Sequence, residues 1–255
     1  MKRIMVIALN TFKENLRDKI LYNLVFFGLM LIGSSILLGS LTIGEQDKIT
    51  KDLGLASINA FGVLIAIFVG IGLVSREIEK RTIYSIIAKP VPRYQFLLGR
   101  YSGLALTLFV NTAIMTVGFV LVLLLASVSL DVGLMKAIGL IFLELILITA
   151  VAIMFSTFTT PTLSATFSLA IYVIGHLTGD LKALGDRLDN DLVSGVLNFL
   201  YYILPNLEYF NIKSEAVHGI PISSSYLLMT VSYGATYAAF VMVAACMIFQ
   251  RRDFK

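Results

Sequence analysis

Long apolar stretches separated by short polar ones dominate the pattern of this chain. A helix crosses a membrane core with roughly 20 apolar residues, at about 1.5 Å of rise each. Stretches near that length predict six transmembrane helices, at 20–43, 56–75, 101–128, 135–158, 162–178 and 226–249. The sequence therefore predicts an all-α membrane protein, with residues 1–255 forming a single transmembrane domain.

The composition supports this interpretation. The chain is 58% hydrophobic and 14% charged, whereas an ordinary soluble domain has about 25% charged residues. No stretch is left for a soluble domain large enough to carry an enzyme. The net charge of +4 is small, and the basic residues lie at the ends of apolar runs, which indicates membrane orientation and not nucleic-acid binding.

The basic residues also predict the orientation. Six spans put both termini on one side of the membrane, and that side carries 14 of the 20 lysines and arginines. Because loops rich in lysine and arginine stay in the cytoplasm, we expect both termini to be cytoplasmic.

Residues 1–19 precede the first span and have helical periodicity. Met5, Leu9, Phe12 and Leu16 share one face, with polar side chains on another, as in an interfacial amphipathic helix. A solvated tail is the alternative. The internal charges and the length of the following apolar run argue against a cleaved signal peptide.

The longest segment outside the predicted spans, 179–221, precedes the last span. It begins with acidic residues and continues with a 13-residue apolar run at 192–204, which Pro205 closes. Thirteen residues are too few to cross the core. We therefore expect an extracytoplasmic insert with a re-entrant or interfacial helix.

The loop between the second and third spans is dense with alternating charge. Residues 76–88 have a helical pattern in which Glu77 faces Arg81 at i+4, a favourable orientation. Pro90 and Pro92 stop that helix. A short, rigid, charged helix suits docking of a cytoplasmic partner. Anchoring to anionic lipid headgroups is the alternative, and the charges alone do not decide between the two.

Residues 74–101 resemble the signature loop of type-2 ABC exporter permeases. That loop has an acidic helix, a threonine followed by aliphatic residues, a proline, an arginine and a Gly-Lys/Arg pair. The matching positions here are Glu77, Glu79, Thr82, Pro90, Arg93, Gly99 and Arg100. Arg81 departs from the pattern, since many members have glycine there. Residues 204–213, L-P-N-L-E-Y-F-N-I-K, are similar to a bacterial subgroup of the same permeases.

The resemblance implies a permease subunit of an ATP-driven exporter in the bacterial cytoplasmic membrane. In that family the loop helix, here 76–93, docks on a separate cytoplasmic ATPase subunit. Two permease copies, identical or closely paralogous, work with two ATPase copies, which bind ATP and Mg²⁺, and the permease itself binds no cofactor. The implied ATPase contacts are Glu77, Glu79, Arg81, Thr82, Pro90 and Arg93.

Motifs for catalysis do not occur in the sequence. It contains no G-x-x-x-x-G-K-[ST] phosphate loop, no H-E-x-x-H metalloprotease motif and no G-x-S-x-G nucleophile-elbow motif. His176 and His218 lack companions at metal-ligand spacing, and the single cysteine, Cys246, excludes an internal disulfide. We expect no metal site and no enzyme activity in this chain.

Polar residues within the spans mark a candidate translocation path. Glu144 would lie about 13 Å deep in the fourth span if that helix starts near Met135. The fifth and sixth spans carry polar and aromatic residues at helical spacing, which suits an amphipathic substrate. The predicted path residues are Asn111, Glu144, Ser168, Tyr172, His176, Tyr233 and Tyr237. The alternative is that these groups only hold helices together.

Two other function classes stay open from the residues alone. An ion-gradient-driven secondary transporter would need paired discontinuous helices and several intramembrane ionisable groups, of which Glu144 is the clear one. A membrane-embedded lipid-modifying enzyme would need clustered acids or histidines near the interface, and the acids within 180–191 are the only cluster. Gly62, Ala66 and Gly70 form a small-residue ridge that permits close helix contact, within the chain or with a second copy.

Overall fold

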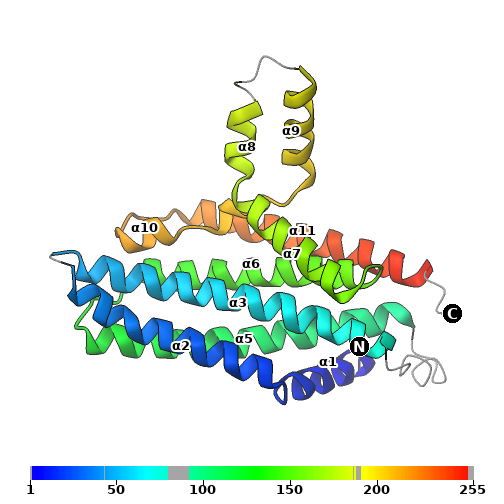
Figure 1. Ribbon diagram of the computed structural model, residues 1–255, viewed down its shortest axis with the longest axis horizontal. Helices are drawn as coiled ribbons and strands as arrows, with labels where there is room; N and C mark the ends of the chain where they lie inside the picture. Colours follow the sequence, from blue (N-terminus) through cyan, green and yellow to red (C-terminus); the bar gives the residue numbers. More distant parts are fainter. Residues whose placement is uncertain (1, 43, 80–91, 186, 188–190, 252–255) are drawn as a thin grey trace.

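The computed structural model describes residues 2–42, 44–79, 92–185, 187 and 191–251. Every regular element within these ranges is helical, because a helix satisfies its own backbone groups where no water can. Long helices run side by side along one axis (Figure 1). They are α2 (Lys19–Ser40), α3 (Gln46–Glu79), α5 (Arg93–Leu125), α6 (Val132–Ser156) and α11 (Ser224–Arg251).

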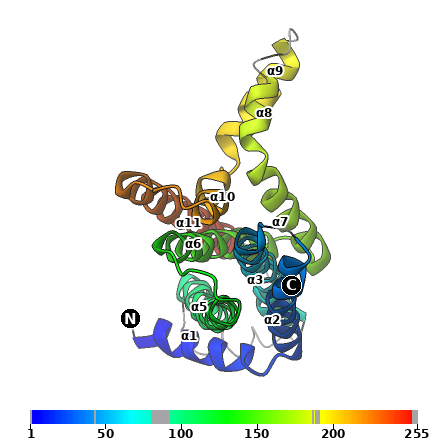
Figure 2. The same cartoon turned by 90° about the vertical axis from the view of Figure 1, so that its left-hand side faces the viewer.

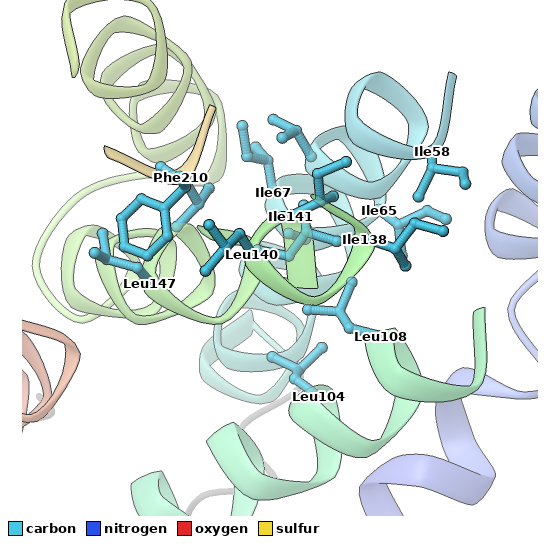
Figure 3. Packing of buried hydrophobic residues seen from close by; sticks show 14 of the residues in the cluster. Ile58, Ile65, Ile67, Leu104, Leu108, Ile138, Leu140, Ile141, Leu147 and Phe210 are labelled. Atoms are coloured by element: carbon cyan, nitrogen blue, oxygen red, sulfur yellow. The ribbon is translucent and has the colours of Figure 1, made fainter. Parts of the chain in front are cut away.

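α3 and α6 form the centre of this bundle. In the most apolar stretch of each helix, 72% of the residues of α3 and 67% of those of α6 are buried, compared with 28–33% in α2, α5 and α11. Figure 3 shows their isoleucines and leucines packed together, with Leu104 and Leu108 of α5 on one side and Phe210 on another. The outer helices therefore keep apolar faces that suit contact with lipid.

The small-residue ridge of α3 packs inside this centre. A Cβ atom on Gly62 would meet Leu145 of α6 at 2.6 Å, and one on Gly70 would meet Ala152 of α6 at 3.7 Å. Ala66 between them is fully buried. The ridge thus serves contact within the chain, and it is not available to a second copy.

α1 (Lys2–Asn15) runs across the end of the bundle and packs on α5 (Figure 2). Its predicted apolar stripe stays partly outside, since Met5 and Leu9 are exposed. A second face, with Thr11 and Asn15, is buried against α5. α1 is therefore fixed to the bundle by a face that the apolar periodicity did not indicate.

A bent helix pair takes the place of the predicted fifth span. α7 (Pro161–His176) has a proline in its first turn, a position that proline favours, and α8 (Thr178–Gly185) follows at an angle of 62°. α9 (Asp191–Ile203) packs back on α8, and this hairpin projects from the bundle (Figure 1). The chain returns through η1 (Glu208–Phe210) and α10 (Lys213–Val217) to α11.

Among the described residues, five helices could each cross a membrane by length and composition, or six if the bent pair counts as one span. This confirms the predicted all-α membrane class. Of the segment 76–93, for which a coupling helix is predicted, residues 76–79 are the last turn of α3, and Arg93 begins α5 directly after Pro92. Residues 80–91 lie outside the described residues.

Candidate functional site

A cluster of polar side chains lies inside the bundle, where α3, α6 and α7 meet. Glu144 of α6 is fully buried, and its Oε2 accepts a hydrogen bond of 2.8 Å from Nδ2 of Asn59 in α3. The hydroxyl of Tyr172 in α7 donates to Oδ1 of Asn59 at 2.6 Å. His176, one turn further along α7, brings its Nε2 to 3.3 Å from Glu144 Oε1. We call these four residues the buried polar cluster.

The cluster holds α7 in place. The rings of Tyr172 and His176 lie 4.7 Å apart, and His176 Nδ1 is 3.1 Å from the Tyr172 carbonyl oxygen. A buried polar group without a partner is costly in an apolar surrounding, so the hydrogen bonds from Tyr172 through Asn59 to Glu144 favour this arrangement. Glu144 Oε1 and His176 Nε2 lie within ion-pair distance of each other but make no hydrogen bond among the described residues.

Three of the predicted path residues thus meet in this cluster, namely Glu144, Tyr172 and His176. Sequence reasoning missed Asn59, which completes it. The signal was present, because Asn59 is an amide inside the second predicted span, and polar groups in spans usually find protein partners.

Two other predicted path residues are buried elsewhere in the bundle. The Ser168 hydroxyl donates to the Ser164 carbonyl oxygen of its own helix at 2.7 Å. Asn111 lies on a buried face of α5, and its Nδ2 has no hydrogen-bond partner within the part of the chain that the structure describes. The geometry therefore does not connect either residue to the buried polar cluster.

The predicted tyrosines of α11 fasten the insert. The Tyr237 hydroxyl donates to the carbonyl oxygen of Ile203 at 2.8 Å, and the Tyr233 hydroxyl accepts from the backbone N–H of Asn206 at 2.8 Å. The Tyr209 ring stands edge-on to Tyr233, with 5.5 Å between centroids. These contacts hold the segment between α9 and η1 against α11.

The same segment also touches α7 next to the buried polar cluster. The backbone N–H of Leu207 donates to the carbonyl oxygen of Gly175 at 2.9 Å. A Cβ atom on Gly175 would meet the Leu207 side chain at 2.7 Å, so glycine permits this approach. The insert therefore contacts α7 at the residue before His176 of the buried polar cluster.

At the end of the bundle where α1 lies, an ion pair that is buried on its Arg100 side joins α1 to α5. The Arg100 guanidinium donates to Glu14 Oε2 at 2.7 Å and to the Thr11 hydroxyl at 3.3 Å. One turn along α5, a Cβ atom on Gly103 would meet the Ala8 carbonyl oxygen at 2.6 Å. The Gly-Arg pair of the sequence motif, Gly99–Arg100, is thus part of the α1–α5 contact.

The start of α5 also contacts the end of α11. The Arg93 guanidinium donates to the carbonyl oxygens of Phe249 and Gln250 at 3.3 and 3.1 Å, and the rings of Phe96 and Phe249 stack with 6.2 Å between centroids. A cation suits the carbonyl end of a helix. Two of the other predicted ATPase contacts, Glu77 and Glu79, lie on the last turn of α3, and their side chains are not among the described parts of the structure. The remaining three, Arg81, Thr82 and Pro90, lie outside the described residues.

The five long apolar helices that the described ranges contain, or six with the bent pair, are typical of a multi-pass membrane protein. The family model of the ABC-2 family transporter protein matches residues 5–254, so the chain belongs to this family of ABC transporter permeases. No curated protein matches the chain. The predicted family is confirmed, and with it a role as a membrane component of transport that is not itself catalytic.

Proposed function

We propose that the chain is the membrane subunit of an ATP-driven exporter, coupled to a separate cytoplasmic ATPase subunit. The family match over residues 5–254, together with helices long enough to span the membrane, carries this proposal. The working unit contains two permease copies, identical or closely paralogous, and two ATPase copies that bind ATP and Mg²⁺. It resides in the bacterial cytoplasmic membrane with both termini in the cytoplasm.

Residues 76–93 are the coupling segment. ATP-driven closure of the ATPase subunits pushes on this segment, which joins the end of α3 to the start of α5. The contacts of Arg93 with α11 and of Arg100 with α1 support this role, because they let a displacement at the start of α5 reach two further helices.

The membrane environment gives the remaining elements their roles. α1 lies in the interface with Met5 and Leu9 toward the lipid. α9 exposes an apolar face that includes Leu192 and Phe199, which suits a re-entrant hairpin in the outer leaflet. The buried polar cluster and the tyrosines of α11 line or control the path between two permease copies.

Co-purification with an ATPase subunit tests the coupling. A Glu77→Lys/Glu79→Lys double variant should lose the complex and the permease-stimulated ATPase activity. Glu45→Lys reverses the charge of an exposed glutamate at the opposite end of the bundle and should retain both. If the double variant keeps the complex and the ATPase rate of the parent, residues 76–93 have no coupling role.

The Glu144–His176 pair gives one reason to test proton-coupled secondary transport as a second candidate. Two ionisable groups 3.3 Å apart inside the bundle are what a proton-driven transporter requires. Vesicles holding the purified chain and trapped pyranine, under a pH gradient and without ATP, distinguish the two functions. The exporter proposal expects the proton leak of protein-free vesicles, whereas a leak that Glu144→Gln abolishes would favour secondary transport.

A further inference from the structure

A long groove runs along the outside of the bundle between α5, α6 and α11. Its volume is about 690 Å³, and almost all of its lining is apolar. The groove exists because α11 presents small residues to it over two turns, Gly234, Ala235, Ala238 and Ala239. None of these residues belongs to the buried polar cluster or to the contacts of the insert described above.

The length of the groove suits an extended hydrocarbon chain. From Gly234 to Gln250 it extends about 24 Å along α11, at about 1.5 Å per residue. Its volume is about 690 Å³. The groove can therefore take a hydrocarbon chain laid along α11.

Polar groups gather at one end of this groove. Tyr94 and Gln250 line it there. Arg251 follows Met247, which lines the groove, at i+4 and so continues the same stripe of α11. The rest of the lining, with Tyr101 directing its hydroxyl to the Ile146 carbonyl oxygen at 3.3 Å, offers hydrocarbon. A ligand that matches has an apolar tail and a negatively charged head.

We propose that this groove is a binding site for one anionic phospholipid of the surrounding bilayer. A hydrocarbon chain lies along the small residues of α11, and the headgroup phosphate meets Arg251 and the Tyr94 hydroxyl. Guanidinium groups bind phosphate well, and basic residues at a membrane surface favour anionic lipids. The site requires a membrane-embedded chain but not the ATP coupling proposed above.

Native mass spectrometry of the delipidated full-length chain tests the proposal. The probes are palmitoyl-oleoyl phosphatidylglycerol and the phosphatidylcholine with the same chains. One phosphatidylglycerol should bind per chain, about fivefold more tightly than phosphatidylcholine, and Arg251→Gln should remove that preference. Ala239 is exposed and lines the groove, so Ala239→Phe should fill the groove and abolish phosphatidylglycerol binding. Thr236 is also exposed on α11 but lies outside the groove, so Thr236→Phe is the control and should retain this binding.

Cys246 supplies an independent readout, because it is the only cysteine and it lines the groove. Phosphatidylglycerol should slow its reaction with N-ethylmaleimide in the parent chain and in Thr236→Phe. Equal binding of the two lipids by the parent chain would overturn the headgroup assignment. Undiminished lipid binding by Ala239→Phe would overturn the site, and so would efficient Cys246–Cys246 cross-linking between copies, which would place a second copy in the groove.

Discussion

The ion pair between Arg100 of α5 and Glu14 of α1 should respond very differently to loss of its two partners. The Arg100 side chain is 5% exposed, whereas that of Glu14 is 44% exposed. Glu14→Gln therefore removes the carboxylate from a guanidinium that stays inside the protein, beside the Thr11 hydroxyl and over the Phe96 ring. Arg100→Met leaves the Glu14 carboxylate, which reaches water. The methionine side chain then fills the volume that the arginine occupied.

The difference in exposure sets the expected magnitudes. A hydrogen bond to a charged group contributes about 1.5–3 kcal/mol, and removing one partner of a buried pair costs more than replacing the buried charge by an apolar group. We expect Glu14→Gln to lower the free energy of unfolding by about 2 kcal/mol and Arg100→Met by about 1 kcal/mol. The double variant should resemble Arg100→Met, because the buried guanidinium is then absent.

Two measurements in detergent micelles check this reasoning. Denaturant-induced unfolding gives the free energies, and hydrogen exchange over residues 2–15 reports whether α1 leaves α5. Glu14→Gln should raise exchange in α1 most, while α6 stays protected in all three variants. Equal losses in both single variants, or a double variant that is less stable than Glu14→Gln, would refute the argument from exposure.

Two further predictions concern the buried polar cluster and the insert. Asn59→Leu removes the amide that accepts a hydrogen bond from Tyr172 and donates one to Glu144. This change should lower the free energy of unfolding by about 1–3 kcal/mol. A thermal melt unchanged from that of the parent chain would contradict this prediction. Gly175→Leu places side-chain atoms where residues 205–207 now lie and should raise hydrogen exchange at 205–210 without changing exchange in α1.

Apolar run lengths were sufficient to predict the helical membrane class, since every backbone group in lipid must be satisfied within a helix. They could not show the bend after His176, because periodicity does not encode helix direction. Nor could they show the partners of Arg100, since its contact with Glu14 joins residues 86 positions apart. Glu144, Tyr172 and His176 stood out as polar groups in apolar runs, but only the packing of α3 against α6 added Asn59 to them.

α11 is the element through which the two ends of the bundle can act on one another. At one end its last carbonyls accept from Arg93, at the start of α5. Toward the other end Tyr237 and Tyr233 hold the insert, whose Leu207 is hydrogen-bonded to Gly175 beside the buried polar cluster. Because a helix is stiff along its axis, a displacement of α5 that carries α11 with it must move the insert or break these hydrogen bonds. The tyrosines that the sequence suggested as a lining for the path therefore also supply a connection by which coupling could reach the cluster.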